Sequence, residues 1–366
     1  MLKTEPSEHF DLKPAENTPR TFATTSSDVT VLVPAHNEGP WLAETIRSIK
    51  SQTLQAEGVI VIDDCSTDDT SAIASSLGVT VLRSMKHLGS KAASQNYALP
   101  SVKSRYVVAV DADTILEKHA LERMVSAIKR TGAMACSGWV LPKETKTVWE
   151  RGRFVEYMFA FAWYKQIQNA YGYPLICSGC FNIYDTQKLM AMGGYPFPTV
   201  TEDLDLTWRI YEDGIGRIAF VPDAVCYPSE PNTLQTICRQ LKRWSYGFQE
   251  NMKNHWRKII KVEKFRIFAL CAWIEGTAAA LYYLIGVPII FYVFGWVPIA
   301  LLFASDWIIM GIPAVIGAHK FGLVKRVLWY LPSYYILRLV NSFYFLTAFF
   351  AVWIFNKRLN VYEKGH

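Results

Sequence analysis

The fold is decided by VTVLVPAHNE (residues 29–38), VIVIDD (59–64) and VVAVDAD (107–113). Each stretch is a short run of Val, Ile and Leu that ends in polar residues. Amphipathic segments such as WLAETIRSIK (41–50) lie between the runs. Near-continuous apolar strands that alternate with helices are typical of a parallel sheet covered on both faces. The sequence therefore predicts an α/β domain.

Polar side chains follow three of these strands. In open α/β sheets, ligands bind beyond the carboxyl ends of the strands. Because several strands end in acids, we expect these side chains to converge at one edge. For Asp68 and Asp69 in STDDT, capping of a helix start is the favoured interpretation. The residues expected at the edge are His36, Asn37 and Glu38, then Asp63 and Asp64, and finally Asp111, Ala112 and Asp113.

The C-terminal quarter of the 366 residues differs from the rest, because it consists of long apolar stretches with few charges. About 20 apolar residues suffice to cross a hydrocarbon core. We expect three spans, at 266–294, 296–318 and 327–355. The net charge of +6 comes partly from Lys and Arg beside these stretches. Anionic lipid headgroups are a better match for them than nucleic acid.

The distribution of positive charge raises a question about topology. With the α/β domain inside, three spans place the basic loop 320–326 inside, as the positive-inside bias prefers. The same count places Lys357, Arg358 and Lys364 outside. Either these charges are tolerated there or the count is wrong by one. Glu275, within the first span, should face protein or a water-lined cavity, or reach the headgroups from near a span end.

The remaining segments give weaker signals. Residues 1–27 are polar and lack an apolar core of a secretory signal, so we expect a disordered arm. Seven cysteines without a paired C-x-x-C array indicate a reduced domain that faces the cytoplasm. The aromatic segment 152–173 is compatible with a buried helix, a face on the bilayer or a wall of a sugar groove. Residues 233–260 predict a basic interfacial helix.

Three motifs carry the chemistry. In D-A-D at 111–113, one carboxylate suits a hard cation such as Mg²⁺ or Mn²⁺, and the other suits a sugar hydroxyl. In T-E-D at 201–203, Asp203 can accept the proton of an attacking hydroxyl, although these residues equally fit a helix cap. In Q-L-K-R-W at 240–244, Arg243 can pair with a diphosphate and Trp244 can stack on a sugar.

Taken in order, these motifs resemble family 2 glycosyltransferases, specifically the polymerising membrane-embedded members such as hyaluronan, chitin, poly-N-acetylglucosamine and cellulose synthases. The resemblance implies a GT-A fold and an inverting transfer from a nucleotide sugar. It rests on VPAHNE (33–38), VIDDCSTDDT (61–70), GSKA (89–92), DADT (111–114), SGCF (178–181), GGY (193–195), TEDLDLTWR (201–209), PDA (222–224) and QLKRW (240–244).

The resemblance also assigns roles to residues. Glu202 and Asp203 would form the catalytic pair, with Asp203 as the base. Asp113 would hold the Mn²⁺ or Mg²⁺ ion. Donor contacts would come from Ala35, Asn37, Glu38, Asp64 at a uracil-type base, Lys91, Asp111 and Ala112. Diphosphate and acceptor contacts would come from Ser178, Gly179, Gln240, Arg243 and Trp244.

The chain departs from the family pattern at His36, where Tyr is common, at Cys65, where a Gly is usual, and in G-S-K instead of G-K. None of these changes removes a charge that the chemistry needs. We expect a disordered arm (1–27), a GT-A catalytic domain (28–230), an interfacial region (231–264), a transmembrane region (265–356) and a short tail (357–366).

Two enzymes and one non-enzyme fit this organisation. The leading hypothesis is a polymerising β-glycosyltransferase with a UDP-sugar donor, UDP-N-acetylglucosamine first. The alternative enzyme transfers one sugar to a polyprenyl phosphate lipid or another single acceptor. A binding subunit with a decayed site is disfavoured because the acidic residues and Arg243 are all present. The expected partners are the donor, a glycan or lipid-linked acceptor, the bilayer, and a second copy or partner subunit as an open alternative, but no nucleic acid.

Overall fold

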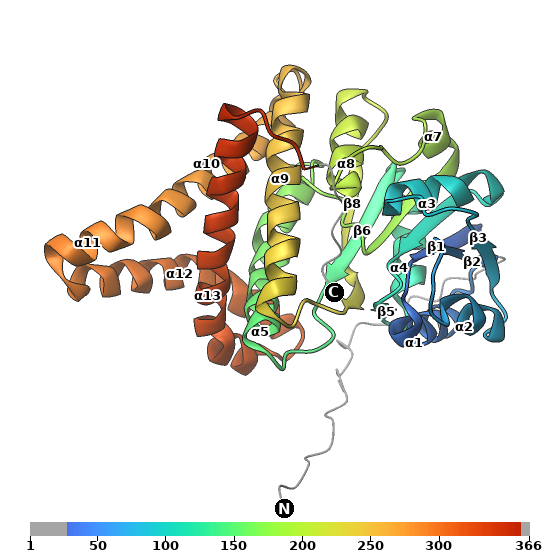
Figure 1. The fold of residues 1–366 in the computed structure, drawn as a ribbon, viewed down its shortest axis with the longest axis horizontal. Helices are drawn as coiled ribbons and strands as arrows, with labels where there is room; N and C mark the ends of the chain where they lie inside the picture. Colours follow the sequence, from blue (N-terminus) through green and yellow to red (C-terminus); the bar gives the residue numbers. More distant parts are fainter. Residues whose placement is uncertain (1–27, 360–366) are drawn as a thin grey trace, which may run out of the picture.

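The computed structural model describes residues 28–359. The predicted arm at 1–27 and most of the predicted tail lie outside these residues. A mixed eight-stranded sheet lies in the right half of the view in Figure 1, in the order β3-β2-β1-β4-β7-β6-β8-β5. Its strands are β1 (Val29–Ala35), β2 (Gly58–Asp63), β3 (Thr80–Arg83), β4 (Tyr106–Val110), β5 (Thr114–Leu116), β6 (Ala135–Val140), β7 (Phe181–Asp185) and β8 (Ile218–Pro228).

The first half of the sheet follows the predicted pattern. Strands β3, β2, β1 and β4 are parallel, and Val31 of β1 lies opposite Val59 on one side and Val108 on the other. Val31 packs into the core on one face of the sheet, whereas its neighbour Leu32 packs into a second core on the other face. The prediction of an α/β domain with a doubly covered sheet is confirmed. Strand β7 is antiparallel to both β4 and β6, which the sequence pattern did not indicate.

Helices cover both faces of the sheet. Helix α5 and the π-helical turn η2 connect the sheet to the C-terminal helices. The helices of the domain are α1 (Gly39–Lys50), α2 (Thr70–Ser76), α3 (Lys91–Ala98), η1 (Leu99–Ser101), α4 (Ala120–Thr131), α5 (Val148–Phe159), η2 (Ala160–Tyr164), α6 (Lys165–Ala170), α7 (Thr186–Ala191) and α8 (Glu202–Glu212).

The aromatic segment 152–173 is mainly a buried helix, one of the three alternatives left open above. Phe154, Val155 and Met158 of α5 are buried in the core, and α5 packs against the C-terminal helices α12 and α13. The second half of the segment is more open, because Trp163, Tyr164, Ile167 and Tyr171 are exposed.

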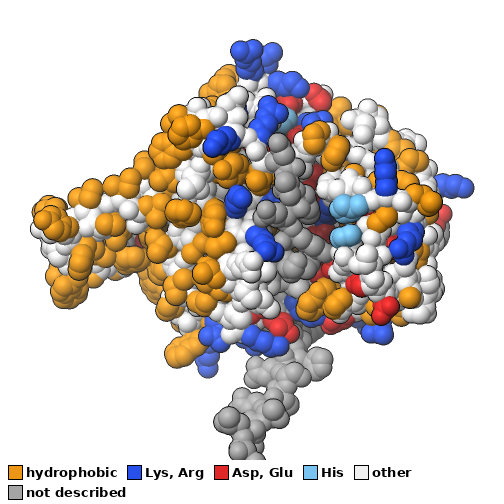
Figure 2. All heavy atoms as spheres, in the orientation of Figure 1, with side chains coloured by type: hydrophobic (Ala, Val, Ile, Leu, Met, Phe, Trp, Pro, Cys, Tyr) orange, Lys and Arg blue, Asp and Glu red, His pale blue; other side chains and the backbone are white. Residues whose placement is uncertain are grey.

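The rest of the described chain is helical: α9 (Leu234–Ile259), α10 (Glu263–Leu281), η3 (Tyr282–Gly286), α11 (Val287–Phe294), α12 (Trp296–Lys320), α13 (Val324–Phe349) and η4 (Phe350–Ile354). Among the described residues, three helical segments are long and apolar enough to cross a membrane: Glu263–Phe294, Trp296–Lys320 and Val324–Ile354. The prediction of three such segments is confirmed. Apolar side chains gather on the left of the view in Figure 2, over the side formed by these C-terminal helices. Glu275 accepts a hydrogen bond from the Tyr164 hydroxyl, so it faces protein.

The contact between α5 and α13 depends on a glycine. A Cβ atom at Gly152 would lie 2.7 Å from the Ser333 carbonyl oxygen and 2.9 Å from the Leu337 Cβ. At Gly286, another helical glycine, the nearest atom would lie at an ordinary 3.6 Å.

We predict that Gly152→Ala is less stable than Gly286→Ala by about 1–3 kcal/mol, because forcing a methyl group into a filled contact moves backbone. Both variants gain the same helix propensity, so their difference isolates the contact. Thermal unfolding in detergent measures it. Equal midpoints for the two variants would contradict the close packing of α5 on α13.

Candidate active site

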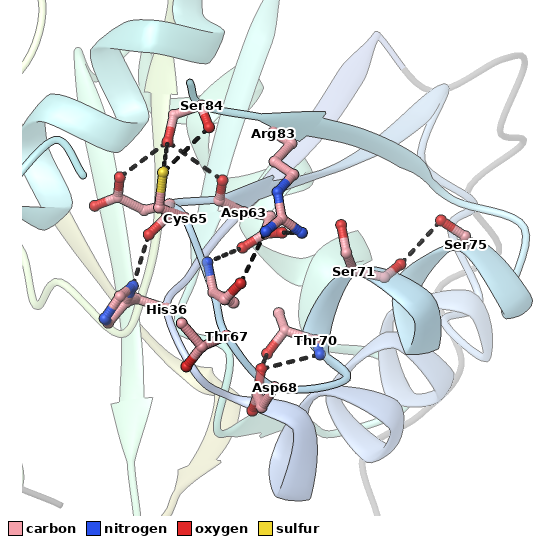
Figure 3. A network of polar contacts seen from close by, with 12 residues as sticks. His36, Asp63, Cys65, Thr67, Asp68, Thr70, Ser71, Ser75, Arg83 and Ser84 are labelled. Atoms are coloured by element: carbon pink, nitrogen blue, oxygen red, sulfur yellow. Dashed lines mark hydrogen bonds and ion pairs between the residues drawn. The ribbon is translucent and has the colours of Figure 1, made fainter. Parts of the chain in front are cut away.

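The loops after β1 and β2 are joined into one polar rim (Figure 3). The Asn37 amide donates to Ser66 Oγ at 2.9 Å, and Asn37 Oδ1 accepts from the Thr67 amide at 2.8 Å. The Glu38 amide donates to Thr70 Oγ1 at 2.8 Å. Asn37 has a φ of 56°, in the left-handed region that Asn tolerates better than most residues. The turn therefore gives a reason for an Asn at position 37 that is independent of its predicted contact with the sugar donor.

The two acids after β2 have different surroundings. Asp63 is fully buried, and it pairs with Arg83 at 3.0 Å and accepts from the Ser66 amide at 2.9 Å, so it holds the loop. Asp64 accepts from the Leu88 amide at 2.7 Å and lies 3.0 Å from His87 Nδ1. Asp64 therefore lies just beyond the carboxyl end of β2, where the contact with a nucleotide base is predicted.

His36 and Asp68 also belong to this rim. His36 Nδ1 lies 2.6 Å from the Asp64 carbonyl oxygen, and the His36 and His87 rings are 4.5 Å apart. Asp68 accepts from the Gly39 amide at 2.9 Å and from Thr70, which ties the starts of α1 and α2 together. Asp69 occupies the N-cap position of α2 without a side-chain bond. Of the two acids assigned to capping, only Asp68 therefore makes such bonds.

Lys91, at the start of α3, draws acids from two separate elements together. It forms an ion pair with Asp111, and its Nζ lies 3.7 Å from Glu202 Oε1. It also donates to the Gly179 carbonyl at 2.9 Å. The Gly179 amide in turn donates to Asp203 Oδ2 at 2.9 Å. The structure thus brings Lys91, Asp111, Gly179, Glu202 and Asp203, all chosen from sequence, into one cluster.

Glu202 and Asp203 begin α8. Thr201, at the N-cap position, makes no capping bond with its side chain, and instead its hydroxyl accepts from Asn251 of α9 at 3.1 Å. Burial raises the pKa of Glu202, and the Asp203 charge adds to this, whereas Lys91 and Arg243 oppose it. Asp203 Oδ1 accepts from the adjacent Leu204 amide at 2.8 Å. The capping interpretation of Thr201 is therefore wrong.

The residue set around D-A-D fits a divalent cation that also binds substrate. The Asp113 side chain is mostly buried, and Asp111 is about one-third exposed. Ala112 is buried, and its carbonyl accepts from Thr45 at 2.8 Å. Among residues 28–359 there is no group of three or more His, Cys, Asp or Glu that could hold a metal. Two carboxylates match Mg²⁺, which usually binds one or two of them together with substrate phosphates.

The Q-L-K-R-W motif on α9 gathers around a residue that the sequence analysis missed. Arg153 of α5 is 1% exposed and donates to Gln240 Oε1 at 2.6 Å. Its guanidinium lies 4.6 Å from the centre of the Trp244 ring, and it pairs with Glu156 and, at 3.5 Å, with Glu230. An arginine inside an aromatic, mostly apolar segment was the available signal. Arg243 donates instead to the Val200 carbonyl at 3.1 Å, beside the start of α8.

A second missed residue lies beneath Ser178. Lys165, at the start of α6, is 5% exposed, and its Nζ donates to Ser178 Oγ at 2.8 Å. The ring of Phe161 lies 4.7 Å from this ammonium group. Burial lowers the pKa of Lys165 to about 8, although the nearby Cys177, Cys180 and Asp203 act in the opposite direction. Lys165 thus supports the loop that carries Ser178 and Gly179 from below.

Comparison with known proteins adds to this picture. Two poly-beta-1,6-N-acetyl-D-glucosamine synthases, from Staphylococcus aureus (strain COL) and Staphylococcus epidermidis, are each 23% identical over 246 residues, or 66% of this chain. The chain spans 60% of the length of these relatives. The mannosyltransferase PcManGT of Pyrobaculum calidifontis has a similar fold, with a TM-score of 0.53 and 19% identity over 91% of this chain and 90% of that one.

The order of the sheet and the similarity to PcManGT define the fold, which is of the GT-A type. Residues 30–193 match the model of Glycosyl transferase family 2. The predicted resemblance to polymerising family 2 synthases is confirmed by the curated relatives.

Gly179 leaves no room for a side chain. A Cβ atom there would lie 2.9 Å from Asp203 Oδ2 and 3.2 Å from Lys91 Nζ. We predict that Gly179→Ala lowers kcat by about 10²-fold. The added methyl group must push Asp203 or Lys91 aside, and a shift of about 1 Å in a reacting group can lower the rate by this factor. The matched control is Gly58→Ala in β2, where the nearest atom is at 4.0 Å. Steady-state kinetics of nucleotide release measures both, and an unchanged Gly179→Ala rate would exclude Asp203 from the reacting groups.

A histidine couples the helix of Glu202 and Asp203 to the helix of the Q-L-K-R-W motif. His255 of α9 lies 2.8 Å from Glu212 and 3.5 Å from Asp205, both on α8. Burial alone would lower the pKa of His255, but Asp205 and Glu212 raise it from 6.5 to about 9.

Because the folded-state pKa of His255 exceeds the ordinary value, its contribution to stability is full below about pH 6.5 and is lost as the pH rises through about 9. We therefore predict that the thermal midpoint falls between about pH 6.5 and 9, and falls less in His255→Gln. The comparison separates His255 from other groups that titrate there. Parallel curves for the two proteins would rule out the charged contact.

Proposed function

We propose that this protein is a membrane-bound, inverting β-glycosyltransferase that uses a UDP-sugar and Mn²⁺ or Mg²⁺ to elongate a glycan. The observation that carries the proposal is the placement of Asp203, whose carboxylate accepts from the Gly179 amide within the cluster of Lys91 and Asp111. UDP-N-acetylglucosamine is the first donor to test, because the curated relatives are named as synthases of a β-1,6-linked N-acetylglucosamine polymer.

The proposed reaction is a single displacement. The acceptor hydroxyl attacks the anomeric carbon, Asp203 takes the hydroxyl proton, and the bond to the diphosphate oxygen breaks so that the nucleoside diphosphate leaves. The two Asp203 oxygens are directed by the Gly179 and Leu204 amides. Such fixed hydrogen bonds keep the base oriented before the substrate arrives.

The donor would lie along the rim. Asn37, Glu38 and Asp64 would border the nucleoside, and Lys91 and Asp111 would face the diphosphate and sugar. Asp113 would hold the metal ion, which when bound would neutralise charge that develops on the leaving diphosphate. PcManGT, which shares the fold, was solved with GDP-Man and Mn²⁺, so a guanosine donor belongs in the test beside uridine.

The acceptor end would lie near α9. Arg153 holds Gln240 and lies over the Trp244 ring, so the indole has a fixed orientation. A fixed aromatic face suits the apolar side of a sugar ring. The domain limits proposed above, with the catalytic part at 28–230 and the interfacial part at 231–264, put this end beside the membrane-facing helices, and the catalytic part would face the cytoplasm.

The alternative is transfer of one sugar to a polyprenyl phosphate lipid. One observation favours it: α9, which carries Gln240 and Trp244, packs directly on the apolar helix α13. An acceptor with a lipid tail could therefore approach Trp244 from the membrane side.

The test is release of UDP or GDP by the full chain in nanodiscs with a panel of UDP- and GDP-sugars, and with Mn²⁺, Mg²⁺ or EDTA. We predict metal-dependent release that falls about 10²–10⁴-fold in Asp203→Asn, as is typical when a general base is lost. Asp213→Asn, an exposed acid just after the same helix, is the matched control and should retain activity.

The products decide between the alternatives. A ladder of lengths on a gel identifies a polymerase, and one product in the lipid fraction identifies single transfer. No release with any donor, or full activity of Asp203→Asn, would overturn the proposal.

A further inference from the structure

Both ends of α13, the last candidate span, are attached to the part of the molecule that carries the site. Near its start, the Tyr330 hydroxyl lies 3.1 Å from Thr145 Oγ1, and the Arg151 guanidinium lies 5.3 Å from the Tyr330 ring centre. Just before α13, Lys320 pairs with Asp223 at 2.5 Å. Thr145 lies in the loop before α5, Arg151 in α5, and Asp223 in strand β8 of the sheet.

The C-terminal end of α13 is held by polar side chains of α9. Lys253 donates to the Val352 carbonyl at 2.6 Å and to Asn356 Oδ1 at 2.9 Å. Glu250 accepts from the Leu359 amide at 2.7 Å. Lys253 and Glu250 thus bind the chain that emerges from α13.

Between its ends, α13 lies along α9 and α5. Leu337 forms a small core with Ile237 and Leu241 of α9, and Ser333 lies against Gly152 of α5. Helices α9 and α13 run side by side (Figure 1). Charged side chains of α9 and α5 are costly inside hydrocarbon. A bilayer that enclosed α13 on all sides would have to enclose these helices as well.

Most of the exposed side chains of α13 and η4 are apolar, although Lys325 and Thr347 of α13 are exposed as well. The large apolar ones recur with helical spacing, as expected of a helix with one face on a membrane and the other on protein. They are Leu328, Trp329, Ile336, Leu339 and Phe343 of α13, and Phe350 and Ile354 of η4.

The hairpin of α11 and α12 differs, because it extends away from the α9–α13 pair (Figure 1). Its tip is Gly295, and the adjacent Tyr292 and Trp296 are 91% and 70% exposed. Apolar side chains cover this projection in the face shown in Figure 2. No Lys or Arg occurs between Arg266 and Lys320. The apolar tip of this hairpin contrasts with its base, where Lys320 at the end of α12 pairs with Asp223 of β8.

We propose that, of the described helices, only the α11–α12 hairpin enters the bilayer, and that α13 lies along the membrane surface between the lipid and helices α5 and α9. The chain after α13 then stays on the side of the catalytic domain. This removes the topological conflict, because Lys357 and Arg358 join the basic loop at 320–326 on one side. The proposal concerns membrane attachment and does not depend on which sugar is transferred.

The first test measures depth in the bilayer. Nitroxide labels are placed singly at Trp329→Cys, Ile336→Cys, Phe343→Cys and Phe350→Cys in the full chain with Cys271→Ala, in nanodiscs of anionic and neutral lipid. Oxygen and nickel-chelate accessibility should give one shallow depth for all four. A label at Ile289→Cys, on the hairpin, should lie deeper. A profile in which Ile336→Cys and Phe343→Cys lie deep while the other two are shallow would overturn the proposal.

The second test measures sidedness. Lys357→Cys, after α13, is compared with Lys129→Cys, an exposed position on α4, in sealed vesicles of both orientations. An impermeant maleimide should label both variants in one orientation and neither in the other, after subtraction of the parent chain. Labelling of Lys357→Cys only from the face opposite Lys129→Cys would overturn the proposal. Neither result depends on catalytic activity, so a wrong donor assignment cannot imitate failure.

Discussion

The Lys91 ammonium group is surrounded by acids from different parts of the chain, and the geometry of the site depends on it. Asp111 follows β4 and Glu202 begins α8, so both carboxylates approach one edge of the sheet. Burial makes it costly to ionise Glu202, and repulsion by the neighbouring Asp203 carboxylate adds to this cost. The lysine offsets that cost, and through the Gly179 carbonyl it also fixes the peptide whose amide directs Asp203. A cation that enters together with the substrate would therefore find the charged side chains of the site already in position.

A second buried cation organises the side chains around the Q-L-K-R-W motif. Arg153 joins α5 to α9, and its planar guanidinium can donate to Gln240 while it stacks on Trp244. Lysine could supply the charge but not both contacts. Because α5 also packs against α12 and α13, the same helix connects the Trp244 ring to the membrane-facing part. The two halves of the molecule are thus coupled through packing rather than through a flexible linker.

The sequence predicted the parts of this structure that follow from local pattern. Apolar runs ending in acids identified β1, β2 and β4, and the positions of Asp111 and Asp203 followed from the motifs. Contacts between distant elements could not be predicted in this way. Nothing local shows that Arg153 would meet Gln240, that Lys165 would lie beneath Ser178, or that β7 would run antiparallel. The roles assigned to the individual site residues are still predictions, although five of them lie in one cluster.

The apolar C-terminal helices illustrate the same limit in a different way. Hydropathy identified three stretches that could cross a bilayer, because it counts side chains and not neighbours. For α13, the neighbouring helices decide whether it can cross the bilayer, because one face packs against α5 and α9 and only the other face is exposed. An apolar helix of this kind serves as a wall between lipid and enzyme. With α13 in that position, Trp244 lies on a helix that packs directly against the wall, so a hydrophobic acceptor would reach it by moving along the membrane surface and not through the aqueous face.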